Sequence, residues 1–144
     1  MIEDYVPEIL MSFPPRISDV VRPWVEISPD RVALVEAAGT WTYMQLASVI
    51  VDARAWLLDS GVRPGDRVMI VCENCRAFVA ILLALAGIDA WPVLVSPRLS
   101  AREIDEIRDH CTLPAVLRMQ RSMPNGMARP SRRSRIWAQS ASAL

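Results

Sequence analysis

The chain has 144 residues, 52% of them hydrophobic, and no net charge; this length suits one ordinary domain, and the composition excludes an intrinsically disordered protein. All 16 basic residues are arginine, so the chain itself cannot supply a Schiff-base lysine, a phosphate-loop lysine or a lysine that clamps an acyl phosphate. Residues 1–117 carry ten arginines against all 16 acidic residues, a net charge of −6, whereas residues 118–144 carry six arginines and no acidic residue, which indicates two segments of different character.

The first part of the chain is predicted to contain small, local elements. Residues 1–17 are expected to be an irregular lead-in, because three prolines interrupt them. Ser18 is predicted to cap a short helix that has Pro23 near its first turn. The runs at residues 32–35 and 40–42 flank an Ala-Gly turn, a pattern typical of a β-hairpin.

A long helix is predicted to follow the hairpin. Thr42 and Gln45 have the spacing of a capping box, and Gly61 suits the left-handed residue that ends a helix. Between them, apolar residues recur on one helical face, at Leu46, Ile50, Ala53 and Leu57. The apolar run at residues 68–72 is then expected to be a strand buried on both faces.

The predicted elements alternate from residue 68 onward. The strand is followed by a buried helix at 76–88, a buried strand at 91–95, a helix to about residue 110 whose capping box is Ser100 and Glu103, and the start of a strand at 115–117. Alternating buried strands and crossover helices predict an α/β fold, a partial parallel βαβ sheet with flanking helices. We place this unit at residues 18–117.

Residues 77–95 form a 19-residue stretch with a single charge, at Asp89. A transmembrane helix needs about 20 apolar residues, but Gly87, Asp89 and Pro92 break the helical pattern. A buried helix followed by a buried strand is the favoured interpretation, so no membrane contact is expected.

The cysteines indicate little chemistry. Cys72 and Cys75 have the Cys-x-x-Cys spacing of thioredoxin-type motifs, but the Trp and Pro that neighbour the motif in redox enzymes are absent. A zinc site would need four ligands, and only His110 and Cys111 could join, without a recognisable spacing. We therefore predict no metal site. Three cysteines and an acidic start without a secretory leader predict a cytoplasmic protein.

No apolar periodicity survives after Leu117. Residues 118–144 are rich in arginine and serine and are predicted to be a disordered basic tail, which a frameshift or premature end near Leu117 would explain. Basic tails bind nucleic acid through its phosphates, but arginine that arises by accident in a shifted frame is the favoured explanation. A nucleic-acid partner is not expected.

Five segments between residues 29 and 110 form an ordered set of motifs. The most specific is Gly-Val-Arg-Pro-Gly-Asp-Arg-Val at residues 61–68, and the others lie at residues 29–35, 39–46, 74–85 and 96–99. In this order they resemble the start of the adenylate-forming (AMP-binding) superfamily, and most of all its acyl- and aryl-CoA synthetase branch. In the last segment, Ser96 replaces the usual Asn of Asn-Pro-Arg-Leu. The chain thus resembles an N-terminal fragment of such an enzyme.

The resemblance implies an ATP-, Mg²⁺- and CoA-dependent conversion of a carboxylic acid to an acyl-adenylate and then to a thioester. The family's glycine-rich phosphate loop has no counterpart, because the chain lacks lysine and never has two glycines within three residues. The fragment alone is therefore expected to bind none of these cofactors and to be inactive, and no catalytic residue is assigned. The resemblance also implies a contact between Arg98 and a CoA phosphate, although a surface loop arginine is the favoured alternative.

A second interpretation remains open, in which the chain is a non-catalytic module that binds a separately made remainder of the enzyme. A partial sheet lacks neighbours, and uncovered apolar faces favour self-association or pairing with such a remainder. The identity of the acid substrate is not readable from these residues.

Overall fold

The computed structural model describes residues 14–111 and 115–118. Most of the predicted lead-in and nearly all of the predicted basic tail lie outside these residues. In chain order the elements are η2 (Ile17–Asp19), α2 (Arg22–Ile27), β1 (Val32–Glu36), β2 (Gly39–Thr42), α3 (Tyr43–Asp59), β3 (Arg67–Val71), α4 (Arg76–Gly87), β4 (Trp91–Val95), α5 (Ala101–Cys111) and β5 (Ala115–Arg118).

The sheet is built around β3, which pairs in parallel with β4 on one side and with β5 on the other. Helix α4 connects β3 to β4, and α5 connects β4 to β5. The prediction of a partial parallel βαβ sheet is confirmed, including the strand at 115–117, which extends one residue further to Arg118. All three strands end at the same edge, because they run in the same direction.

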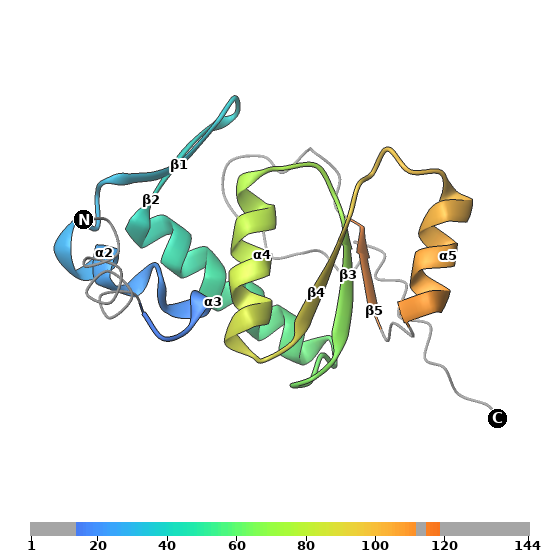
Figure 1. Ribbon diagram of the computed structural model, residues 1–144. Coiled ribbons are helices and arrows are strands. Elements are labelled where there is room, and N and C mark those ends of the chain that lie inside the picture. Colours follow the sequence, from blue (N-terminus) through green and yellow to red (C-terminus); the bar gives the residue numbers. More distant parts are fainter. Residues whose placement is uncertain (1–13, 112–114, 119–144) are drawn as a thin grey trace, which may run out of the picture.

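Helices cover both faces of the sheet, with α3 and α4 on one side and α5 on the other (Figure 1). Successive side chains of a strand point to opposite faces. Val68 and Ile70 accordingly pack in a cluster with residues of α3 and α4, whereas Met69 and Val71 pack against Ile104 of α5 and its neighbours. The apolar run of β3 is thus explained, because both of its faces are buried.

The predicted ends of α3 are confirmed. The backbone N–H of Gln45 donates to Oγ1 of Thr42 at 3.2 Å, and the backbone N–H of Thr42 donates to Oε1 of Gln45 at 2.9 Å. This reciprocal pair satisfies two amides that the first turn of a helix leaves free. After α3, Gly61 has φ +93°, the left-handed conformation expected for it.

Two predictions about local structure are wrong. Ser18 does not cap a helix: it lies within the 3-10 turn η2, and the next helix begins only at Arg22, where Pro23 occupies the first turn. The strand at 91–95 is not buried throughout, because Trp91 is 68% exposed and Leu94 is exposed as well. Strand β4 is less buried than predicted because it lies at the edge of the described sheet.

Pro92 lies within this edge strand, opposite Val68. The N–H of Trp91 donates toward the β3 side, to the carbonyl of Asp66 at 2.7 Å. Since successive residues of a strand alternate in direction, the nitrogen of Pro92 faces the open edge. Proline is tolerated in a sheet at such a position because no ladder hydrogen bond is lost.

The β1–β2 hairpin is antiparallel, as predicted, and one side chain holds it against α4. Nε of Arg76, the first residue of α4, donates to Oε2 of Glu36 at 2.9 Å, and the guanidinium lies 4.8 Å from the ring centroid of Trp41. Arg76 is the buried charged residue of the described chain. The hairpin and the sheet domain are therefore joined by a partly buried ion pair and a cation–π contact.

Residues 77–95 form nearly all of one helix and a separate strand, as expected, because α4 spans Arg76–Gly87 and β4 begins at Trp91. Among the described residues, no helix combines the length and apolar character that crossing a membrane requires.

Candidate functional site

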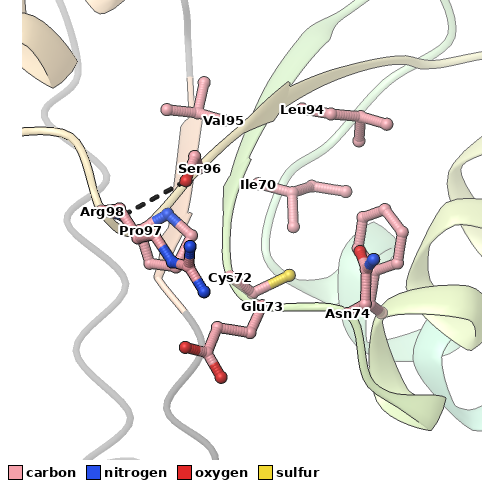
Figure 2. Close-up of a pocket in the computed structure, with 10 residues that line it drawn as sticks. Ile70, Cys72, Glu73, Asn74, Leu94, Val95, Ser96, Pro97 and Arg98 are labelled. Atoms are coloured by element: carbon pink, nitrogen blue, oxygen red, sulfur yellow. Dashed lines mark hydrogen bonds between the residues drawn. The ribbon is translucent and has the colours of Figure 1, made fainter.

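A cavity of about 440 Å³ lies at the carboxyl ends of β3 and β4 (Figure 2). In open α/β sheets, ligands bind in crevices at this end of the strands. Apolar side chains of β3, β4 and α4 line part of the cavity, and polar side chains that follow the two strands form its rim. The lining residues are Ile70, Cys72, Glu73, Asn74, Phe78, Leu94, Val95, Ser96, Pro97 and Arg98.

Three segments of the chain meet here. The turn that leaves β3 supplies Glu73 and Asn74, the first turn of α4 supplies Phe78, and the end of β4 with its loop supplies Leu94 and Ser96. Asn74 and Ser96 belong to two separate segments of the resemblance, at residues 74–85 and 96–99, and the motifs alone do not place them together. The signal was available, because the predicted parallel sheet already brings the residues after each strand to one edge.

Arg98 lies in the loop after β4 and is exposed. Its backbone N–H donates to Oγ of Ser96 at 3.3 Å, and its guanidinium extends toward the Cys72–Glu73 side of the cavity (Figure 2). Arg98 is thus a loop arginine that also lines the cavity. A guanidinium at this rim is suited to an anionic group, which it can contact through two parallel hydrogen bonds.

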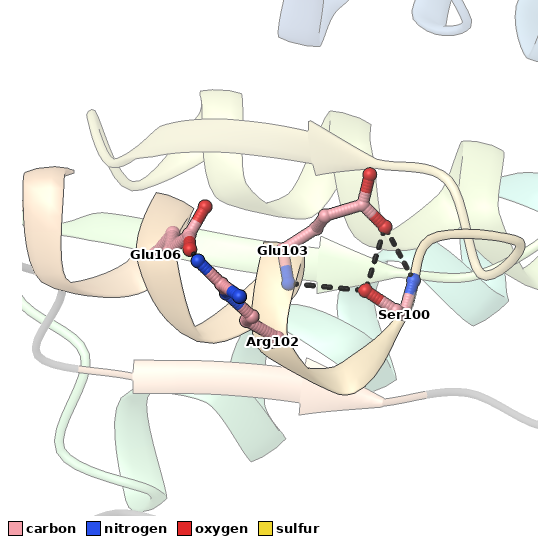
Figure 3. Close-up of polar contacts among 4 residues, drawn as sticks. All are labelled: Ser100, Arg102, Glu103 and Glu106. Atoms are coloured by element: carbon pink, nitrogen blue, oxygen red, sulfur yellow. Dashed lines mark hydrogen bonds and ion pairs between the residues drawn. The ribbon is translucent and has the colours of Figure 1, made fainter.

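The loop that carries Arg98 leads directly into a fixed helix start (Figure 3). The backbone N–H and the hydroxyl of Ser100 donate to Oε2 of Glu103 at 2.8 Å and 2.7 Å, and the backbone N–H of Glu103 donates back to Oγ of Ser100 at 3.3 Å. The predicted second capping box is therefore confirmed. These bonds from Ser100 hold the pKa of Glu103 below its usual range, so the cap stays ionised at neutral pH.

The Cys-x-x-Cys segment is part of the same turn. Burial, and to a smaller extent the charge of nearby Cys75, raises the pKa of the Cys72 thiol to about 11. A thiol acts as a nucleophile only in its ionised form. Cys72 therefore remains protonated at neutral pH, which is the opposite of what a thioredoxin-type attacking cysteine requires.

We expect Cys72 to alkylate slowly in the folded chain. At pH 8 a thiol with a pKa of about 11 is roughly 0.1% ionised, at least about a hundredfold less than a thiol near 8.5. Iodoacetamide labelling followed by peptide mass spectrometry measures this rate, and the same peptide in urea is the matched control. The rate should rise about tenfold per pH unit up to pH 11. Equal rates at pH 8 in folded and unfolded chain would contradict the raised pKa.

No group of three or more His, Cys, Asp or Glu residues suited to a metal ion occurs within residues 14–111 and 115–118. His110 and Cys111, which sequence reasoning considered as partners of the Cys-x-x-Cys pair, lie at the end of α5. The three cysteines are free thiols.

A comparison against protein families matches most of the chain. The model for the family described as AMP-binding enzyme matches residues 21–141. The chain belongs to this family. The match includes both capping boxes, the whole sheet and the cavity, and it continues into the segment after residue 118 that was predicted to be a basic tail.

Curated members of the AMP-binding family are similar over most of this chain. It is 33% identical over 102 residues to the hybrid PKS-NRPS synthetase LUC5 of a Fusarium species, covering 70% of this chain and 3% of the relative. It is 30% identical over 105 residues to 3-oxocholest-4-en-26-oate–CoA ligase of Rhodococcus rhodochrous, covering 73% of this chain and 19% of the relative. The chain therefore spans less than a fifth of these AMP-binding relatives.

Solved structures give the same result. The N-terminal subdomain of Klebsiella oxytoca NpsA, in complex with 3-hydroxybenzoyl-AMSN, superposes with a TM-score of 0.68 and 28% identity. The match covers 77% of this chain and 28% of that one. These comparisons confirm the prediction that the chain resembles the N-terminal part of an adenylate-forming enzyme of the AMP-binding family.

Proposed function

We propose that the chain is the N-terminal part of an ATP-dependent, cytoplasmic acid–CoA ligase. In such a ligase a carboxylic acid and ATP form an acyl-adenylate and pyrophosphate, and CoA then displaces AMP to give a thioester. The observation that carries the proposal is the similarity of this chain to a CoA ligase, at 30% identity over 105 residues. Residues 18–117 are the proposed N-terminal subdomain of this synthetase, in truncated form.

We also propose that these 144 residues alone do not catalyse the reaction. Phosphate-binding turns present several backbone amides, commonly from closely spaced glycines, and add a cation. The chain has five glycines, never two within three residues, and no lysine. We therefore propose that ATP, Mg²⁺ and CoA are bound only when the rest of the domain is present, by pairing with a separate chain or within a longer one.

Arg98 is the residue of this segment that we assign to a cofactor. It stands at the polar rim of the cavity, next to Ser96, where a phosphate of CoA would meet its guanidinium. Charge-assisted hydrogen bonds of this kind contribute about 1.5–3 kcal/mol.

We expect the 144-residue chain to release no pyrophosphate above background from ATP, Mg²⁺ and a panel of aryl, steroid and fatty acids, with or without CoA. A coupled pyrophosphate assay measures this, with an active CoA ligase as positive control. Turnover that depends on the acid would contradict the assignment of an inactive fragment. Translation of the DNA beyond codon 117 in all three frames is expected to show a glycine-rich phosphate loop in one of them.

Joining the chain to that downstream sequence supplies the complete enzyme for the test of Arg98. The Arg98→Ala variant is expected to raise the KM for CoA about tenfold or more while the KM for ATP stays unchanged. Arg102→Ala is the matched control, because Arg102 is exposed on α5 and pairs with Glu106 of the same helix. An unchanged KM for CoA in the Arg98→Ala variant would remove this assignment without affecting the family assignment.

A further inference from the structure

Helix α3 has a second row of apolar and small side chains, on the face opposite its buried one. The buried row contains Leu46 and Leu57, which pack into the core. The second row consists of residues that are all exposed, namely Met44, Ser48, Val51, Ala55 and Leu58. We call this row the α3 seam. Exposed helix faces are ordinarily polar, so the seam lacks an explanation in the isolated chain.

The seam has the spacing of a helix–helix contact. Its members follow one another at intervals of four, three, four and three residues, which is the heptad alternation of coiled-coil core positions. Three larger side chains alternate with Ser48 and Ala55, and small residues let a second helix approach closely. The seam is about 21 Å long, since a helix rises about 1.5 Å per residue. A second copy of α3 can therefore contact the seam along its whole length.

The charges beside the seam are complementary to those of a second copy. Gln45, Asp52 and Asp59 follow one border of the seam, and Arg54 lies on the other. With Ser48 and Ala55 at heptad position a, Arg54 takes position g and Asp59 position e. In a parallel helix pair, a residue at position g faces the residue at position e that lies five positions further along on the partner. Arg54 would then face Asp59 of the second copy, twice by symmetry. An antiparallel pair would instead bring the two copies of Asp52 together.

Arg54 is held in place beside the seam. One of its terminal nitrogens donates to the carbonyl of Gly87 at the end of α4 at 2.6 Å. A guanidinium has five N–H donors, so this bond leaves others for a carboxylate of a second copy. The charged border of the seam is thus positioned before any association takes place.

We propose that two copies of this chain associate through the α3 seam, with their α3 helices parallel around a two-fold axis. A two-fold contact needs a surface that is complementary to itself, and the seam with its Arg54 and Asp59 borders meets that condition. One helix face buries less than the roughly 800 Å² per partner of a stable interface. The dimer is therefore weak and concentration-dependent. The proposal does not depend on ligase activity.

Sedimentation velocity of the full 144-residue chain, from about 1 µM to about 500 µM, covers the expected affinity range. The wild-type chain should shift from monomer toward dimer as the concentration rises. Val51→Arg, at the centre of the seam, should remain monomeric. Val35→Arg is the matched control, because Val35 is 78% exposed on the hairpin and Val51 is 65% exposed; this variant should dimerise like the wild type.

The charges test the orientation of the two helices. Asp59→Arg is expected to weaken dimerisation about tenfold, because it places two arginines together in the parallel arrangement. Combining it with Arg54→Asp should restore the wild-type affinity, with circular dichroism as the check on folding. A monomer at all concentrations, a dimer that survives Val51→Arg, or a dimer lost in Leu94→Arg instead would overturn the proposal.

Discussion

Replacing Leu57 by alanine is expected to lower the free energy of unfolding by about 2–5 kcal/mol, because the buried side chain leaves a cavity that its neighbours fill only partly. Leu57 is 0% exposed and packs with Val68, Ile70 and Leu85 in the core between α3, β3 and α4. A domain of this size has about 5–15 kcal/mol of stability in all. The substitution therefore removes a large part of it.

Urea denaturation followed by tryptophan fluorescence measures this loss, since Trp56 packs against the same cluster. The matched control is Leu58→Ala, the adjacent residue of the same helix, whose side chain is 40% exposed. At concentrations where the chain is monomeric, this control should change the free energy of unfolding by less than about 1 kcal/mol. Similar losses in the two variants would contradict the position of α3 on the sheet.

Replacing Arg76 by alanine is expected to lower the free energy of unfolding by about 2–4 kcal/mol. Removing one partner of a buried ion pair leaves the other charge without compensation, which costs about 3–5 kcal/mol when both are fully buried. Glu36 keeps some contact with water, so the expected value is lower. The cation–π contact with Trp41 is lost in addition.

The same urea denaturation measures this effect, and the fluorescence of Trp41 should report a loosened hairpin. Arg102→Ala serves as control, because that side chain is 88% exposed and its partner Glu106 lies on the same helix; exposed pairs contribute about 0–1 kcal/mol. Glu36→Gln, which keeps a hydrogen-bond acceptor, should cost less than Arg76→Ala. If Arg76→Ala costs no more than Arg102→Ala, Arg76 does not clamp the hairpin.

The features that the sequence predicted correctly are those set by near neighbours in the chain. Both capping boxes depend on residues three positions apart, and Gly61 ends α3 by its own conformational freedom. The strand β3 was also predicted, because burial on both faces leaves a continuous apolar run. Local spacing and composition are sufficient in such cases.

The features that could not be predicted from the sequence depend on the order of the strands in space. Strand β4 has the same apolar character as β3, but it lies at the edge, so Trp91 is exposed. Arg76 pairs with Glu36, forty residues away, and no local pattern connects them. The turn after β3 and the loop after β4 both line the cavity, and the crossover through α4 brings them to the same edge of the sheet. Its polar rim could be anticipated from the parallel sheet, but not its shape.

The position of Pro92 has a consequence for how this sheet can grow. A strand arriving alongside β4 would need hydrogen-bond donors from the outward-facing residues, and proline supplies none. That border is therefore closed to regular extension, which also discourages sheet-to-sheet aggregation. In the proposed ligase, additional strands are expected to join beyond β5, so the cavity beside Leu94 would stay at the margin of the enlarged domain, where the proposed cofactor would enter from solvent without crossing the interior.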